Sequence, residues 1–260
     1  MSQIALKALL LSRWHGAAVH GQVAPLSGWL TGIDSVDQAL APVGIPRGRL
    51  TEIFGHFSSG KTTFAYALLA NRLATGDIAA YIDPEASFFA PAARSAGIDL
   101  SRLIIARPRS AQALLRAADA LVRGGACSVV VVDAGKSTIL QTHHCARLVA
   151  QAEKTGTTLL VLSHGHSSAL ASFATVRLWA RRLSPVWQPG ADGGSRLLGY
   201  AIDMEIAKAR TVAPGKLFSF AVFVPEVVGS WPVSAANTPP GDLESGSLRR
   251  PTALASAANQ

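Results

Sequence analysis

A glycine-rich stretch, GHFSSGKTT at residues 55–63, has residue types and spacing that suit the binding of phosphate. Gly55, Gly60, Lys61 and Thr62 fit the pattern G-x-x-x-x-G-K-[ST], in which successive backbone N–H groups surround phosphate oxygens. The glycines allow backbone conformations and close approach that a Cβ would forbid. The lysine supplies a point charge for the β and γ phosphates, and the threonine hydroxyl can bind Mg²⁺. The stretch therefore predicts a site for ATP with a magnesium ion.

The segments on either side of this loop predict a strand before it and a helix after it. LTEIF at residues 50–54 is a short apolar run, and TTFAYALLANRLA at residues 62–74 repeats apolar side chains at four-residue spacing. A helix that begins at the loop directs the positive end of its dipole at a bound phosphate. This context favours a phosphate site over a glycine-rich turn that matches the pattern by chance.

An aspartate follows a second apolar run, VVVVD at residues 129–133. Such a run is typical of a strand buried in a parallel sheet, and open parallel sheets bind their ligands at the carboxyl ends of the strands. A carboxylate at that position can hold Mg²⁺ through water. Asp133 is therefore predicted to hold the metal together with Thr62, although a strand can also end in an aspartate that has no function.

Much of the remaining sequence alternates apolar runs with helical patterns, which predicts an α/β fold with a mostly parallel sheet and helices on both faces. The predicted strands of this part are residues 50–54, 78–82, 103–106, 129–132 and 159–162, and the predicted helices are residues 64–73, 111–122 and 146–153. After residue 175 the pattern changes to successive strands, predicted at residues 176–183, 199–210 and 217–224. We expect them to extend the sheet in antiparallel fashion at its C-terminal end.

By composition, the chain divides into three parts. Residues 1–44 predict a short amphipathic helix and a connector, because three early leucines recur at helical spacing. Residues 45–228 hold the α/β core. Residues 229–260 are rich in Ser, Ala, Pro and Gly and have no apolar period, which predicts a disordered tail.

Charge and cysteine content narrow the classes of protein to which the chain can belong. The formal net charge is +8, which favours a polyanion or an acidic partner, but only 15% of residues are charged and no long basic tract occurs. Two cysteines do not make a disulfide framework. We find neither a signal peptide nor a run of roughly 18 uncharged apolar residues. These features predict a soluble cytoplasmic protein that makes no contact with a membrane.

The order of these segments resembles the ATPase core of the RecA recombinase family, over roughly residues 45–226. GIPRGRLTEIFGHFSSGKTT is similar to the entry of that family into its phosphate loop. YIDPEASFFAPAARSAGIDLSRLIIARP is similar to the next segment, in which an acid after the second strand is the catalytic base. The resemblance implies that Glu85 activates the water that attacks the γ-phosphate, with Lys61 as the other catalytic residue. An exposed acid that opens a helix is the alternative for Glu85.

Two later segments also resemble the family. TTLLVLSHGH is similar to the strand whose final glutamine senses the γ-phosphate in recombinases, and His164 stands at that position. A neutral histidine can still donate to a phosphate oxygen, with a different reach and protonation. GYAIDMEIAKAR is similar to a closing strand, where Lys208 and Arg210 occupy paired basic positions that reach the ATP of a neighbouring subunit. A solvated strand edge is the alternative for this pair. The residues predicted to contact the nucleotide are Gly55, His56, Phe57, Ser58, Ser59, Gly60, Lys61, Thr62, Thr63, Asp133 and His164.

The chain departs from the recombinase pattern in three places. The segments between residues 133 and 157 and between residues 164 and 174 are much shorter than in a recombinase. Both loops that hold single-stranded DNA are therefore expected to be absent or reduced, since stacking platforms and basic grooves need residues to build them. Phe89 and Ala92 replace the residues that contact adenine in recombinases, which leaves the choice of base open.

A RecA-like core with shortened DNA loops resembles the ImuA type of accessory protein. The resemblance implies an ATP-binding protein with weak ATPase activity in SOS-type DNA damage tolerance. Its partners in translesion synthesis would be an ImuB-like relative of the Y-family polymerases and an error-prone replicative polymerase. Contact with RecA, self-association and weak contact with DNA stay open. The alternatives are a scaffold that does not hydrolyse ATP, a SulA-like inhibitor of cell division, and a RecA- or RadA-like paralogue that binds DNA directly.

Overall fold

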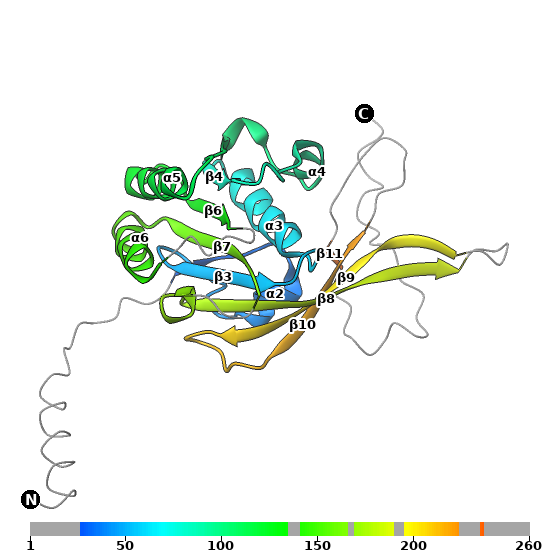
Figure 1. The fold of residues 1–260 in the computed structure, drawn as a ribbon. Coiled ribbons are helices and arrows are strands. Elements are labelled where there is room, and N and C mark those ends of the chain that lie inside the picture. The colour runs from blue at the N-terminus through cyan, green and yellow to red at the C-terminus, as the bar shows by residue number, and fades with distance from the viewer. Residues whose placement is uncertain (1–26, 135–140, 166–168, 190–194, 224–234, 237–260) are drawn as a thin grey trace, which may run out of the picture.

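The structure, a computed structural model, describes residues 27–134, 141–165, 169–189, 195–223 and 235–236. Within these ranges the chain forms a nine-stranded sheet of order β11-β10-β9-β8-β3-β7-β6-β4-β5 (Figure 1). Its strands are β3 (Leu50–Gly55), β4 (Ala79–Ile82), β5 (Leu103–Ala106), β6 (Val129–Asp133), β7 (Thr158–His164), β8 (Val176–Pro189), β9 (Ser195–Lys208), β10 (Leu217–Phe223) and β11 (Ala235–Ala236). The strands from β8 to β5 are parallel, and β9, β10 and β11 pair in antiparallel fashion. The predicted fold class is confirmed.

Helices cover both faces of the parallel part. The helices are α2 (Asp34–Ala39), α3 (Lys61–Ala74), α4 (Ala90–Ser95), α5 (Ala111–Gly124) and α6 (Thr142–Thr155), with short 3₁₀ turns η1 (Leu100–Arg102) and η2 (Ala169–Ser172). Buried side chains of α2, α3 and α4 form one apolar layer, and those of α5 and α6 form another on the opposite face. The valines of β6 are fully buried between these layers, as predicted for a continuous apolar strand.

The antiparallel extension reaches further than the sequence predicts. β8 runs to Pro189 instead of ending at residue 183, and β9 begins at Ser195 instead of residue 199. The pairing of β3 with β8 ends at Ala180, so the distal half of the β8–β9 hairpin stands away from the parallel strands (Figure 1). Its backbone is paired while its side chains are less buried, as Trp187 with 55% exposure illustrates. A strand held mainly by backbone pairing leaves only a weak apolar pattern in the sequence.

Part of the predicted connector packs on the core. A two-stranded sheet of β1 (Gly28–Trp29) and β2 (Ile45–Pro46) flanks α2, and Val36 is fully buried in the layer that contains α3. The Trp29 indole donates to the Thr158 hydroxyl at 3.0 Å, which ties this segment to β7. The predicted N-terminal helix lies outside the described residues, as does the predicted tail apart from β11. No helix in the described ranges has both the length and the apolar character needed to cross a bilayer.

Candidate functional site

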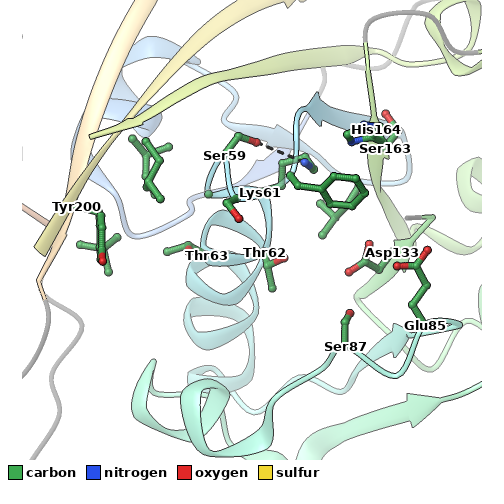
Figure 2. Close-up of a pocket in the computed structure, with 17 residues that line it drawn as sticks. Ser59, Lys61, Thr62, Thr63, Glu85, Ser87, Asp133, Ser163, His164 and Tyr200 are labelled. Atoms are coloured by element: carbon green, nitrogen blue, oxygen red, sulfur yellow. Dashed lines mark hydrogen bonds between the residues drawn. The ribbon is translucent and has the colours of Figure 1, made fainter. Parts of the chain in front are cut away.

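The glycine-rich loop connects β3 to α3 at the carboxyl edge of the sheet (Figure 2). Gly60 directly precedes α3 and has a φ of 87°, in the left-handed region that favours glycine. A Cβ at Gly60 would lie 2.6 Å from Cδ1 of Ile202 on β9, and a Cβ at Gly55 would lie 2.3 Å from the carbonyl oxygen of Ala180 on β8. Both glycines are therefore required by strands that press against the loop.

Lys61 is held against the loop by backbone carbonyl groups. Its Nζ donates to the carbonyl oxygens of Gly55 at 2.9 Å and His56 at 2.5 Å, and lies 3.4 Å from the Ser59 hydroxyl. Burial lowers the pKa of Lys61, and the charge of Asp133 opposes that shift. A partly desolvated ammonium attracts anions more strongly than one in bulk water. When a phosphate binds, its charged oxygens would take the place of these carbonyl oxygens as hydrogen-bond acceptors for Lys61.

A cavity of about 350 Å³ opens in front of the loop (Figure 2). The predicted residues that line this cavity are Phe57, Ser58, Ser59, Gly60, Lys61, Thr62, Thr63, Glu85, Asp133 and His164. Gly55 and His56 adjoin it through the carbonyl groups that Lys61 contacts. Groups that lie far apart in the sequence are thus brought to one edge of the parallel sheet, where ligands of such folds bind.

Asp133 ends β6 and provides a carboxylate at the cavity. The Tyr81 hydroxyl donates to its Oδ2 at 2.9 Å. Burial and the negative charge of Asp133 raise the pKa of Tyr81, so the phenol stays a donor. Figure 2 shows Asp133 on the same side of the start of α3 as the Thr62 hydroxyl. One carboxylate, one hydroxyl and phosphate oxygens are the ligands that Mg²⁺ takes in nucleotide sites, so this donor set fits the metal.

Glu85 lies at the rim of the cavity on the turn after β4. The turn is organised by Asp83, a fully buried carboxylate. Its Oδ1 accepts from the backbone N–H of Ser87 at 2.8 Å, and its Oδ2 accepts from that of Phe88 at 3.0 Å. α4 begins only at Ala90, so Glu85 does not open a helix. The hydrogen bonds of Asp83 therefore fix the turn that carries Glu85 at the cavity.

His164 connects the end of β7 to the phosphate loop. It pairs in register with Gly55, and its ring stacks on Phe57 with centroids 4.1 Å apart. The His56 ring meets it edge-on at 5.8 Å. A displacement of Phe57 would therefore disturb His164 directly. Its role as a sensor of the γ-phosphate stays a prediction.

Lys208 and Arg210 do not line the cavity. Lys208 pairs in register with Arg177, which in turn pairs with Glu52 near the start of β3, away from the loop. The Lys208 ammonium donates to the carbonyl oxygen of Ala171 at 2.9 Å, and burial and nearby arginines lower the pKa of Lys208. The structure thus separates these two cations from the phosphate loop of their own chain. Their action on a neighbouring subunit stays a prediction.

Seven further residues line the cavity that the sequence analysis did not assign to it. Ser87, Leu162 and Ser163 lie within two residues of Glu85 or His164, and the other four come from β8, β9 and β10 and are Leu183, Tyr200, Ile202 and Val222. The alternation of apolar and polar residues along β9 placed Tyr200 and Ile202 on one face of a strand. That pattern does not indicate which segment of the chain packs against this face of β9. Phe89 and Ala92 do not line the cavity, and Phe89 is 63% exposed.

Sequence comparison relates the chain to RecA proteins. Residues 20–144 match the family model of the RecA N-terminal domain. The RecA protein of Nocardia farcinica is 31% identical over 230 residues, which cover 75% of this chain and 65% of that protein. The RecA protein of Chloroherpeton thalassium is 30% identical over 232 residues, which cover 76% of this chain and 64% of that protein. The chain spans less than two thirds of the length of these curated relatives. The chain is therefore RecA-like in sequence and in fold.

Proposed function

We propose that this chain binds ATP with Mg²⁺ and hydrolyses it slowly. The observation that carries the proposal is that Lys61, Thr62, Glu85 and Asp133 line one cavity at the carboxyl edge of the sheet. An ammonium, a hydroxyl and two carboxylates in this arrangement are the groups that transfer of a phosphoryl group to water requires. The match to the RecA N-terminal domain supports the same activity.

Each group has a separate task in this proposal. The N–H groups of the loop and Lys61 bind and orient the triphosphate, and Thr62 and Asp133 hold Mg²⁺, which neutralises charge on the phosphates when bound. Glu85 orients the attacking water and accepts its proton. Among the described residues that line the cavity, Lys61 is the single lysine or arginine. Because cations stabilise the charge that develops on the transferred phosphoryl group, one such cation supports slow turnover by an isolated chain.

The test measures ATP affinity and turnover for the wild type and for the Lys61→Ala and Glu85→Gln variants. Loss of the general base should lower turnover by about 100-fold or more in Glu85→Gln, while ATP affinity changes little. Loss of the ammonium should weaken ATP binding by about tenfold or more in Lys61→Ala. Glu153→Gln on α6, outside the cavity, is the matched control and should change neither quantity.

Two results would contradict parts of this proposal. Turnover that survives both substitutions would come from another source and would remove the ATPase assignment. Tight ATP binding without any turnover in the wild type would instead favour the RecA-like scaffold that does not hydrolyse ATP.

We further propose that the chain works in the cytoplasm through protein partners in DNA damage tolerance, as ImuA-type proteins do. The short connections support this proposal, because β6 ends at Asp133 and α6 already begins at Thr142, while β7 ends at His164 and η2 begins at Ala169. Few residues remain to build loops that hold single-stranded DNA. The proposed partners are an ImuB-like polymerase relative and an error-prone replicative polymerase.

Two binding measurements test this part. The chain should co-purify with an ImuB-like polymerase relative from the same genome, and ATP should change the amount recovered. Affinity for single-stranded DNA should be weak and should fall steeply with salt, since it would rest on the net charge of +8. Nanomolar DNA affinity that changes little with salt would contradict the proposal and favour a RecA- or RadA-like paralogue that binds DNA directly.

A further inference from the structure

The cavity has an apolar half that phosphate chemistry leaves unused. Leu183, Tyr200, Ile202 and Val222 line it, and we call them the apolar patch. Leu183 is the register partner of Ile202, and Val222 is the register partner of Tyr200. Register partners and residues two apart along a strand share one face of a sheet. The apolar patch is therefore continuous and spans three strands.

Ile202 sets the position of the patch relative to the phosphate loop. Its side chain packs against Gly60, where an added Cβ would lie 2.6 Å from Cδ1 of Ile202. Tyr200 lies on the same face two residues away, about 7 Å further along the strand. In Figure 2, Tyr200 lies on the opposite side of the start of α3 from Asp133 and Glu85. The patch thus begins at the loop and leads away from the carboxylates.

The direction of a bound nucleotide follows from this arrangement. The terminal phosphate belongs beside Glu85 and Asp133, because these groups activate water and hold the metal. The ribose and the base must then leave the loop on the other side, where Thr63 and Tyr200 lie (Figure 2). Tyr200 lies about 7 Å along the strand from Ile202, which contacts the loop. This separation leaves room for a ribose between the phosphates and the base.

We propose that the apolar patch is the base subsite of the nucleotide site and that the Tyr200 ring stacks on the base. This inference rests on the proposed ATP-binding function, and it names the side chain that contacts the base while the loop holds the phosphates. Tyr200 is 37% exposed, so part of its ring is accessible from the cavity. Leu183, Ile202 and Val222 offer apolar contacts beside it.

The same chemistry makes the subsite tolerant of base identity. A site binds a related ligand much more weakly only when that ligand leaves buried polar groups of the site without hydrogen bonds. The apolar patch carries a single polar group, the Tyr200 hydroxyl. Stacking on an aromatic ring discriminates little between bases, since every base has a π-face. The chain therefore binds ATP and GTP with affinities within about fivefold of each other.

The experiment measures dissociation constants for ATP, GTP and inorganic tripolyphosphate in Mg²⁺ by calorimetry. The wild type should bind both nucleotides about tenfold more tightly than tripolyphosphate. Tyr200→Ala should weaken both nucleotides by about tenfold and leave tripolyphosphate unchanged, while Tyr200→Phe should keep ATP within about twofold of the wild type. Trp187→Ala removes an exposed aromatic side chain outside the cavity on the same hairpin and should change none of the three constants.

The outcomes separate this inference from the proposed function. Equal affinity of the wild type for ATP and tripolyphosphate, or equal weakening of both ligands by Tyr200→Ala, would overturn the base subsite and leave ATP binding by the loop intact. A strong preference for ATP over GTP that Tyr200→Ala does not alter would also overturn it, because another group would then read the base. A wild type that binds neither ATP nor tripolyphosphate would overturn the proposed function itself. Circular dichroism of each variant verifies that it is folded.

Discussion

The phosphate loop and the apolar patch are two sides of one cavity that arise in different ways. The loop, residues 55–63, is contiguous, and its backbone N–H groups, its lysine ammonium and its threonine hydroxyl all come from one short segment. The apolar patch joins side chains from β8, β9 and β10 that are ordinary in type and distant in sequence. The contacts proposed for phosphate therefore come from one short segment of the chain, whereas the contacts proposed for the base come from three strands of the sheet.

Side-chain contacts, in addition to the backbone pairing of β3 with β8, connect the strands of the patch to the strand that carries the loop. Ile202 packs against Gly60. Nearer the start of the strands, Arg177 of β8 donates to Glu52 of β3 at 2.6 Å, and the Ser163 hydroxyl donates to the other oxygen of Glu52 at 2.6 Å. Glu52 is fully buried. The buried ion pair and the close approach at Gly60 therefore add to the backbone pairing of β3 with β8 in setting the relative position of loop and patch.

Removal of the ion pair should have the largest effect. Arg177→Ala leaves the buried Glu52 carboxylate without its cation, so the free energy of unfolding should fall by about 3–5 kcal/mol. Urea denaturation measures this change. Arg181→Ala on the same strand is the control, because the Arg181 guanidinium pairs with Glu205 nearer the surface and its loss should cost less than about 1 kcal/mol.

A double variant separates the loss of one charge from the loss of the whole ion pair. Glu52→Gln/Arg177→Met removes both charges, so it should be less destabilised than Arg177→Ala alone. Equal losses of stability in Arg177→Ala and Arg181→Ala would show that the ion pair does not attach the two regions.

A smaller effect is expected where the patch touches the loop. Gly60→Ala should lower the free energy of unfolding by about 2–3 kcal/mol, since the left-handed φ costs about 1–2 kcal/mol and the new methyl group presses on Ile202. Gly76→Ala is the control, because Gly76 has a similar φ of 90° and its added Cβ would meet nothing within 4 Å. The difference between the two variants measures the contact with Ile202.

The double variant Gly60→Ala/Ile202→Ala completes this cycle. Ile202→Ala makes room for the new methyl group. The loss in the free energy of unfolding of the double variant should therefore be smaller than the sum of the two single-variant losses by at least about 0.5 kcal/mol. Losses of stability that add would mean that the patch does not constrain the loop.

The smallest effect concerns pH and belongs to the loop alone. Burial lowers the pKa of Lys61, so the folded chain releases this proton at a lower pH than the unfolded chain does. The stability of the free protein therefore rises as pH increases from the lowered pKa to the ordinary one. ATP affinity should move the opposite way, because deprotonation removes the positive charge of Lys61 that attracts the phosphates.

Dissociation constants for ATP between about pH 8 and pH 10 measure this effect. They should rise by at most about tenfold per pH unit once pH exceeds the lowered pKa, since one proton is linked to binding. Lys61→Arg keeps its charge throughout this range and should show a flat profile. The same slope in both proteins would assign the titration to another group.

Several features of the fold and site could be predicted because local sequence encodes them. Gly60 of the loop has a left-handed φ that favours glycine, and the valines of β6 and the terminal Asp133 form a strand that delivers a carboxylate to the ligand edge. The lengths of β8 and β9 could not be predicted, since the distal hairpin is held mainly by backbone pairing. Nor could Asp83 be recognised as the organiser of the Glu85 turn, because that role rests on three-dimensional hydrogen bonds.

Residues next to one another specify the glycine-rich loop between a buried strand and a helix, so this part of the molecule could be predicted from the sequence alone. The packing of the sheet, by contrast, places Tyr200 and Val222 in the lining of the cavity beside that loop and leaves Lys208 and Arg210 outside it. Strand order and register set these distances. They depend on the packing of the whole sheet, which no short stretch of residues specifies.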